Sequence, residues 1–162
     1  NGLSYRMKVE LWCLGKNTMK YLDVGITDYQ KRIRHYVPFT TEVFQIPSAK
    51  KNESPESIRQ IEADIILKKL SPNDTLILLD ENGKTFGSEQ FANELQRYFN
   101  HSQGKLIFHI GGAFGFHESV YQRATAKISF SKMTFNHLLF RLIFLEQFYR
   151  AMTILRGEPY HH

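Results

Sequence analysis

Cysteine is almost absent from this chain, and long apolar runs are missing altogether. The single cysteine among 162 residues excludes a fold held together by internal disulfide bonds. No apolar segment approaches the ~20 residues that a membrane-spanning helix needs, so we expect no membrane partner. No secretory signal is recognisable, and together with the scarcity of cysteine this predicts a cytoplasmic protein.

Several motifs of catalysis and metal binding are also missing. The chain has no HExxH pattern and no His and Cys spacing typical of structural zinc, so we expect no bound metal. No G-x-S-x-G segment supplies a nucleophile for hydrolysis. Gly83-Lys84-Thr85 resembles the end of a phosphate-binding loop, but Leu78 stands where that loop needs a glycine. We therefore interpret Asn82-Gly83 as a hairpin-like turn.

Positive charge is concentrated in the two ends of the chain. The net charge is +5, and residues 1–52 and 115–162 are basic whereas residues 53–114 are acidic. Clusters such as Lys31-Arg32-Arg34 and Lys50-Lys51 would meet phosphates if folding brought the two ends together. This pattern favours a nucleic-acid partner, although solvated surface lysines would explain it too.

Strand and helix patterns alternate along the chain and predict an α/β fold. Apolar residues recur every three or four positions in the helical segments, and they alternate or run continuously in the strands. Such alternation is typical of a mostly parallel sheet sandwiched by helices. We expect strands at 7–14, 41–46, 75–79, 105–110 and 126–130, and helices at 19–36, 57–70, 88–99, 117–125 and 137–155.

The length suits one domain, and no repeat or linker divides it. Because Met7-Lys8-Val9 resembles a natural start, we assign residues 7–162 to this domain. Residues 1–6 are expected to be a short extension, either native or left by cloning.

The helix expected at 137–155 carries few polar residues. His137 and Arg141 share one edge, Glu146 and Arg150 share the opposite edge, and nearly everything between is apolar. A helix that is apolar most of the way round is buried on more than one side. A terminal helix of a small domain achieves this most easily at a subunit interface, so we expect a homodimer.

A glycine cluster, 111–115, follows the apolar strand that ends at Ile110. Glycines at the carboxyl end of a strand let a ligand approach bare backbone, and such strand ends bind ligands in open α/β sheets. The dinucleotide fingerprint does not fit, because it belongs after the first strand and needs an acidic residue about 20 positions later. The cluster therefore predicts a ligand site of another kind.

The glycine cluster belongs to a larger set of motifs that resembles the RlmH family of SPOUT-class methyltransferases. The matching pieces include Ile110-Gly111-Gly112, the segment 130–135, Tyr149-Arg150-Ala151, and the ending 156–161. The resemblance implies an α/β fold with a C-terminal trefoil knot and a homodimer. It also implies transfer of methyl from S-adenosylmethionine to N3 of a pseudouridine in large-subunit (23S) ribosomal RNA, within the assembled ribosome.

The resemblance also implies which residues form the site. The segment 130–135 and two strand ends would hold S-adenosylmethionine, through Leu79, Gly111, Gly112, Phe130, Ser131, Lys132, Met133, Thr134 and Phe135. A second group would orient the uridine or handle its proton, namely His137, Arg141, Arg150, Tyr160 and His161. Asn136 departs from the family, whose members often have proline before the histidine.

Two other functions remain open at the level of sequence. One is a SPOUT methyltransferase that acts on transfer RNA. The other is a non-catalytic ribosome-binding factor, in which the glycine cluster is only a tight turn.

Overall fold

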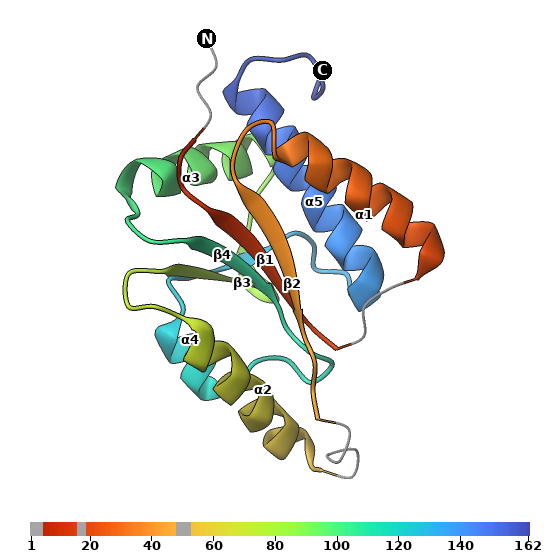
Figure 1. The fold of residues 1–162 in the computed structure, drawn as a ribbon, viewed down its shortest axis with the longest axis vertical. Helices are drawn as coiled ribbons and strands as arrows, with labels where there is room; N and C mark the ends of the chain where they lie inside the picture. The colour runs from red at the N-terminus through yellow and green to blue at the C-terminus, as the bar shows by residue number, and fades with distance from the viewer. Residues whose placement is uncertain (1–4, 16–18, 48–52) are drawn as a thin grey trace.

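Five parallel strands form one sheet at the centre of the structure (Figure 1). The computed structural model describes residues 5–15, 19–47 and 53–162. Every neighbouring pair of strands is parallel, in the order β2-β1-β4-β3-β5, which confirms the predicted sheet. The strands are β1 (Val9–Leu14), β2 (Phe39–Phe44), β3 (Thr75–Thr85), β4 (Leu106–Ile110) and β5 (Ala126–Ser129).

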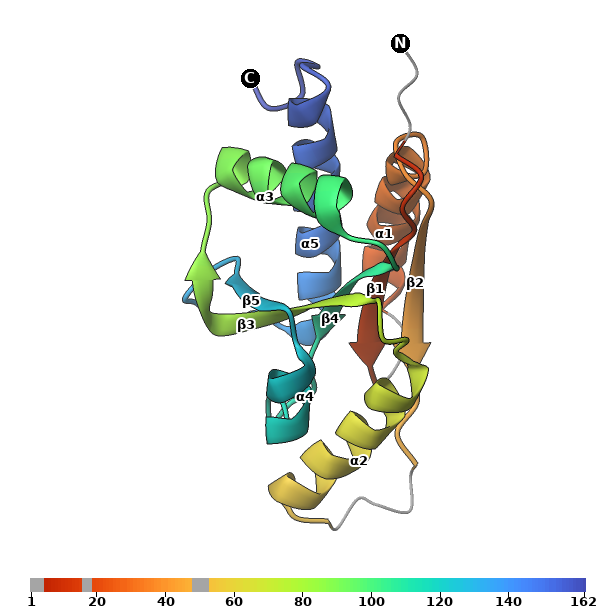
Figure 2. The same cartoon turned by 90° about the vertical axis from the view of Figure 1, so that its left-hand side faces the viewer.

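Helices cover both faces of the sheet (Figure 2). Successive side chains of a strand point to opposite faces, so Leu11 packs into one core and Trp12 into the other. Within the described residues, no helix is long and apolar enough to cross a membrane. One face carries α1 (Lys20–Ile33), α3 (Ser88–His101) and α5 (His137–Leu155), and the other carries α2 (Pro55–Lys69) and α4 (Glu118–Arg123).

Strand β3 departs most from the sequence prediction. The predicted turn at Asn82-Gly83 is wrong, because β3 continues to Thr85. Ile128 of β5 pairs with Leu79 and again with Lys84, so the register shifts between these two residues. A Cβ added at Gly83 would lie 2.7 Å from the backbone nitrogen of Ile128. Gly83 therefore allows two backbones to cross at close range, a requirement that its own sequence neighbourhood does not reveal.

Helix α5 lies between α1 and α3 over the sheet (Figures 1 and 2). Phe144 and Phe148 are fully buried and pack against Phe108 of β4, with ring centroids 5.0 and 6.0 Å away. On α1, a Cβ added at Gly25 would lie 3.0 Å from Leu142, so these two helices approach closely. Much of the apolar circumference of α5 is thus covered by its own chain and does not by itself require a partner.

The start of α5 is fixed by a side-chain cap. The carboxamide oxygen of Asn136 accepts hydrogen bonds from the backbone N–H groups of Leu138 and Leu139, at 2.9 and 3.2 Å. Capping satisfies two donors that a helix N-terminus otherwise leaves unpaired. Asn136 therefore defines the end of the preceding loop without the fixed backbone of a proline.

We predict that Gly83→Ala lowers the free energy of unfolding by about 2–3 kcal/mol, because the added methyl group collides with backbone that cannot rotate away. Urea denaturation measures the change. Gly87→Ala is the matched control, since its Cβ would come no nearer than 3.8 Å to Gln90 and should cost less than about 1 kcal/mol. Equal stability of the two variants would contradict the close crossing.

Candidate functional site

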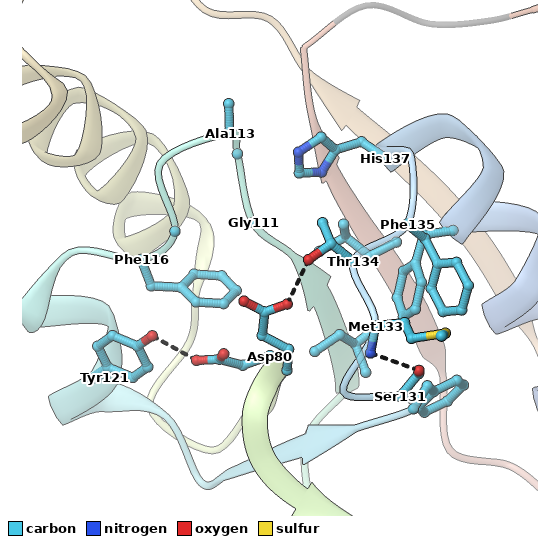
Figure 3. Close-up of a pocket in the computed structure, with 17 residues that line it drawn as sticks. Asp80, Gly111, Ala113, Phe116, Tyr121, Ser131, Met133, Thr134, Phe135 and His137 are labelled. Atoms are coloured by element: carbon cyan, nitrogen blue, oxygen red, sulfur yellow. Dashed lines mark hydrogen bonds between the residues drawn. The ribbon is translucent and has the colours of Figure 1, made fainter.

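A cavity of about 220 Å³ opens where β4 and β5 end on either side of β3, beside residues 79–81 of β3 (Figure 3). Parallel pairing brings the carboxyl ends of β4 and β5 to the same side, the usual ligand position in open α/β folds. The lining residues are Leu79, Asp80, Glu81, Ile110, Gly111, Gly112, Ala113, Gly115, Phe116, Tyr121, Phe130, Ser131, Met133, Thr134, Phe135, His137 and Phe140.

The glycine cluster forms a tight loop that is one wall of the cavity. The N–H of Gly115 donates to the carbonyl of Gly112 at 3.2 Å, and Gly115 has a left-handed φ of +80°. A Cβ added at Gly111 would lie 2.9 Å from the ring of Phe116. Glycine is needed at both positions for different reasons, conformation at Gly115 and close packing at Gly111.

The segment 130–135 forms the opposite wall and is held at several points. The Ser131 hydroxyl accepts a hydrogen bond from the N–H of Met133 at 2.9 Å. The Thr134 hydroxyl donates to Glu81 at 3.0 Å, which ties the segment to the end of β3 (Figure 3). Met133 is 75% exposed, so its side chain does not belong to the core.

Carboxylates dominate the charge of the cavity. Asp80 and Glu81 both line it, whereas no lysine or arginine does so among the residues that the structure describes. The Tyr121 hydroxyl donates to Asp80 at 2.6 Å, and burial together with this bond raises the pKa of the Tyr121 phenol. This hydrogen bond orients the Asp80 carboxyl group. An acidic cavity in a protein of net charge +5 favours a cationic ligand.

The residues expected to hold a cofactor converge as the sequence predicts. All of them line the cavity except Lys132, which is exposed. Sequence reasoning missed Asp80, Glu81 and Tyr121. Asp80 directly follows the continuous apolar run 75–79, as Gly111 follows the run that ends at Ile110, and that signal would have found it.

The residues expected to handle the substrate do not converge within one chain. His137 lines the cavity at the start of α5. Arg150 lies 13 residues further along the same helix, which at 1.5 Å per residue is about 20 Å away. The C-terminus lies at the far end of α5 (Figure 1).

A second polar cluster forms at that far end. Glu146 is its centre, accepting hydrogen bonds from Arg150 and from the Tyr160 hydroxyl, both at 2.8 Å. Arg150 also donates to His161 at 3.1 Å and stacks over the ring of Tyr160, 4.7 Å from its centroid. The terminal segment is therefore folded back onto α5.

Two members of this cluster, Tyr160 and Arg150, have hydrogen-bonding properties that bear on a role in binding. Burial and hydrogen bonds to Tyr29 and Glu146 raise the pKa of the Tyr160 phenol, so Tyr160 stays neutral and donates. The Nε of Arg150 is buried and has no hydrogen-bond partner among the described residues. An unpaired buried donor is costly, and it is a candidate contact for a ligand oxygen.

Two other polar side chains, those of Arg141 and His109, also lie in the core. Arg141 is 4% exposed and does not line the cavity. His109 is 1% exposed, bonds through Nδ1 to the carbonyl of Trp12, and has its pKa lowered by burial to about 4. His109 is thus a neutral core histidine. Among the described residues, no cluster of His, Cys, Asp and Glu suits a metal ion.

Comparison with known proteins identifies the class. A family model described as predicted SPOUT methyltransferase matches residues 7–161, and the chain belongs to this family.

Individual relatives are similar over nearly their whole length. The proteins called ribosomal RNA large subunit methyltransferase H of Parabacteroides distasonis and Flavobacterium johnsoniae are each 49% identical over 158 residues, covering 96% of this chain and 99% of the relative. The protein of the same name from Cytophaga hutchinsonii is 46% identical over 157 residues, 96% of this chain and all of the relative.

We predict that the Cys13 thiol of the folded protein reacts with a disulfide reagent at pH 8 at least about 100-fold more slowly than in the unfolded chain. Cys13 is 1% exposed, and burial raises its pKa to about 11 although the charge of Arg141 acts in the opposite direction. Reagent absorbance measures the rate, and protein in guanidinium is the control. Rapid stoichiometric labelling of folded protein would contradict the buried placement.

Proposed function

We propose that this chain is an S-adenosylmethionine-dependent methyltransferase that methylates N3 of a pseudouridine in large-subunit (23S) ribosomal RNA. The observation that carries the cofactor assignment is the acidic cavity at the strand ends. S-adenosylmethionine has a sulfonium and an ammonium group, whereas nucleotide cofactors bring phosphates that Asp80 and Glu81 would repel.

The residues present fit this cofactor. Gly111 and Gly112 leave backbone bare for close approach of adenosine, and Leu79 and Met133 offer apolar contact. Phe130, Ser131, Thr134 and Phe135 complete the opposite wall, with Lys132 at its exposed edge. The bound cofactor supplies an electrophilic methyl group, and the protein supplies position and a route for the N3 proton.

The substrate-handling residues are proposed to come from two chains. A copy related by a two-fold axis, with its α5 antiparallel to the first, would bring its own Arg150, Tyr160 and His161 to the cavity that the first chain forms with His137. The separation of about 20 Å within one chain is the reason for this proposal.

Each residue then has a distinct task. Arg150 would bind an oxygen of the uridine or a phosphate, Tyr160 would donate a hydrogen bond, and His137 or His161 would accept the N3 proton. Arg141 is buried, so it would act on the reacting uridine through its charge rather than by contact.

Two finer features of the fold are also proposed. The close crossing of Gly83 and β5 supports a C-terminal trefoil knot, in which the segment after β5 passes through a loop of the chain. Residues 7–162 are proposed as one domain. Tyr5, in the expected extension, packs on it by stacking against Phe99 at 4.3 Å.

The ribosomal RNA assignment rests on the names of the relatives and on the basic ends of the chain. Lys31, Arg32 and Arg34 are exposed on or beside α1, where they are available to phosphates, while Lys50-Lys51 lies outside the described residues. So small a domain has little surface for reading sequence, so we propose that the assembled ribosome presents the target. A ribosomal substrate implies a cytoplasmic protein.

The central test measures cofactor binding and methyl transfer with purified protein. Calorimetry should detect S-adenosylmethionine binding, and mass spectrometry of nucleosides should find N3-methylated pseudouridine in intact ribosomes but far less in naked ribosomal RNA. Gly111→Val is the matched variant, since its side chain would collide with Phe116 and close the cavity.

The alternatives give different results. Methylation of a transfer RNA pool would favour a transfer RNA enzyme, and ribosome binding without cofactor binding would favour a non-catalytic factor. Equal methylation of naked RNA would refute the requirement for an assembled particle.

We predict that deleting residues 158–162 abolishes methyl transfer while S-adenosylmethionine affinity stays within about threefold, because the tail does not line the cavity of its own chain. Deleting the exposed His162 alone is the control, with helical content followed by circular dichroism.

A mixed dimer of one tail-deleted chain and one Gly111→Val chain keeps a single complete site, so it should recover about half the activity of the parent dimer. A fully active truncated protein would remove the tail from the mechanism.

A further inference from the structure

A buried carboxylate lies behind the glycine wall of the cavity. Glu62 of α2 is 8% exposed, and its carboxylate occupies the space where a side chain of residue 112 would be. A Cβ added at Gly112 would lie 2.8 Å from Oε1 of Glu62 and would also collide with Oε2. Glu62 does not line the cavity itself, but it contacts Gly112, and it lines a small void together with Gly115 and Phe116, which also line the cavity.

The carboxylate of Glu62 is poorly compensated. Oε1 has no hydrogen-bond partner among the described residues. The void beside it, about 10 Å³, is at the lower limit for one water molecule. Burial raises the pKa of Glu62 to about 7.

The basic groups that surround Glu62 are directed elsewhere. Arg59 donates to Glu56 at 2.6 Å and to the carbonyl of Phe114 at 3.3 Å. The Nε2 of His117 lies 3.4 Å from Glu56. His109, on the strand side of the void, is neutral and bonded to backbone. A positive charge on the far side of Gly112 would therefore be the main stabiliser of ionised Glu62.

We propose that Glu62 is a specificity-determining residue that acts through the backbone of Gly112 to favour the sulfonium cofactor over its neutral thioether product. The inference rests on the proposed function. Glu62 would lie behind the glycine wall from a bound cofactor, and Asp80 and Glu81 would face it directly from the lining of the cavity. Losing the methyl group removes the sulfonium charge, so the attraction to these carboxylates falls at the moment when product must leave.

The sign of the pH dependence follows from linkage. A cationic ligand favours ionised Glu62 and lowers its pKa, so binding near pH 7 releases a proton to the buffer. The apparent affinity for S-adenosylmethionine should rise with pH through the neutral range, by about three- to fourfold between pH 6 and pH 8 if the cofactor binds about fivefold more tightly to ionised than to neutral Glu62. S-adenosylhomocysteine lacks the sulfonium charge and should show a change of less than about twofold.

The first test uses the wild-type protein. Calorimetry in buffers of different ionisation enthalpy counts the protons released when S-adenosylmethionine or S-adenosylhomocysteine binds at pH 7. We expect release with the former and little with the latter. Equal release with both ligands would overturn the proposal.

The second test uses Glu62→Gln, with Asp64→Asn as the matched control because Asp64 is an exposed carboxylate on the same helix. At pH 8, Glu62→Gln should weaken S-adenosylmethionine binding about fivefold and leave S-adenosylhomocysteine within twofold, with the pH dependence lost. His117 and His137 are intact in both variants, so a difference between the variants is assigned to the carboxylate at residue 62.

The outcomes separate this inference from the proposed function. Binding of S-adenosylmethionine with an unchanged ligand ratio in Glu62→Gln would refute the role of Glu62 and leave the methyltransferase assignment intact. Absence of S-adenosylmethionine binding by the wild-type protein would refute the proposed function first. If Glu62→Gln does not fold, the proton count in the wild type still decides the inference.

Discussion

Parallel pairing of β4, β3 and β5 is the constraint on which the site depends. Because β4 and β5 pair in parallel with β3 on either side, Ile110 and Ile128 both lie beside Leu79, so β4 and β5 end near this level of the sheet while β3 continues to Thr85. The glycine loop, the two acids and the segment 130–135 are therefore gathered into one cavity although they are far apart in sequence. The close contact at Gly83 holds β5 against β3. The absence of a side chain at this one position therefore supports the cavity wall formed by the segment 130–135, which follows β5.

Charge is divided in the molecule according to the ligand that each part would meet. The protein is basic overall, yet Asp80 and Glu81 line the cavity and Glu62 lies behind it. A basic exterior attracts phosphates, whereas an acidic interior attracts a small cation. This division would allow one small domain to bind an anionic polymer and a cationic cofactor without competition between them.

The straight helix α5 separates two chemical groups that the proposed reaction needs together. His137 stands at its start beside the cavity, and the cluster of Glu146, Arg150 and Tyr160 stands near its end. The apolar circumference of α5 is largely covered by α1, α3 and the sheet, and the distance between the two groups becomes the stronger reason for a second copy.

The sequence by itself determined the alternating elements, the parallel sheet and most of the cavity wall, because strand and helix periods are local and strand ends of a parallel sheet must meet. The Asn82-Gly83 turn was mispredicted because Gly83 is required by a tertiary contact. Its missing side chain makes room for the backbone of β5, and the local sequence pattern cannot reveal this contact. Only the tertiary structure decided that Glu62 lies against Gly112 and that Arg150 lies far from His137. Both depend on how helices pack on the sheet, and long-range packing leaves no periodic mark in the sequence.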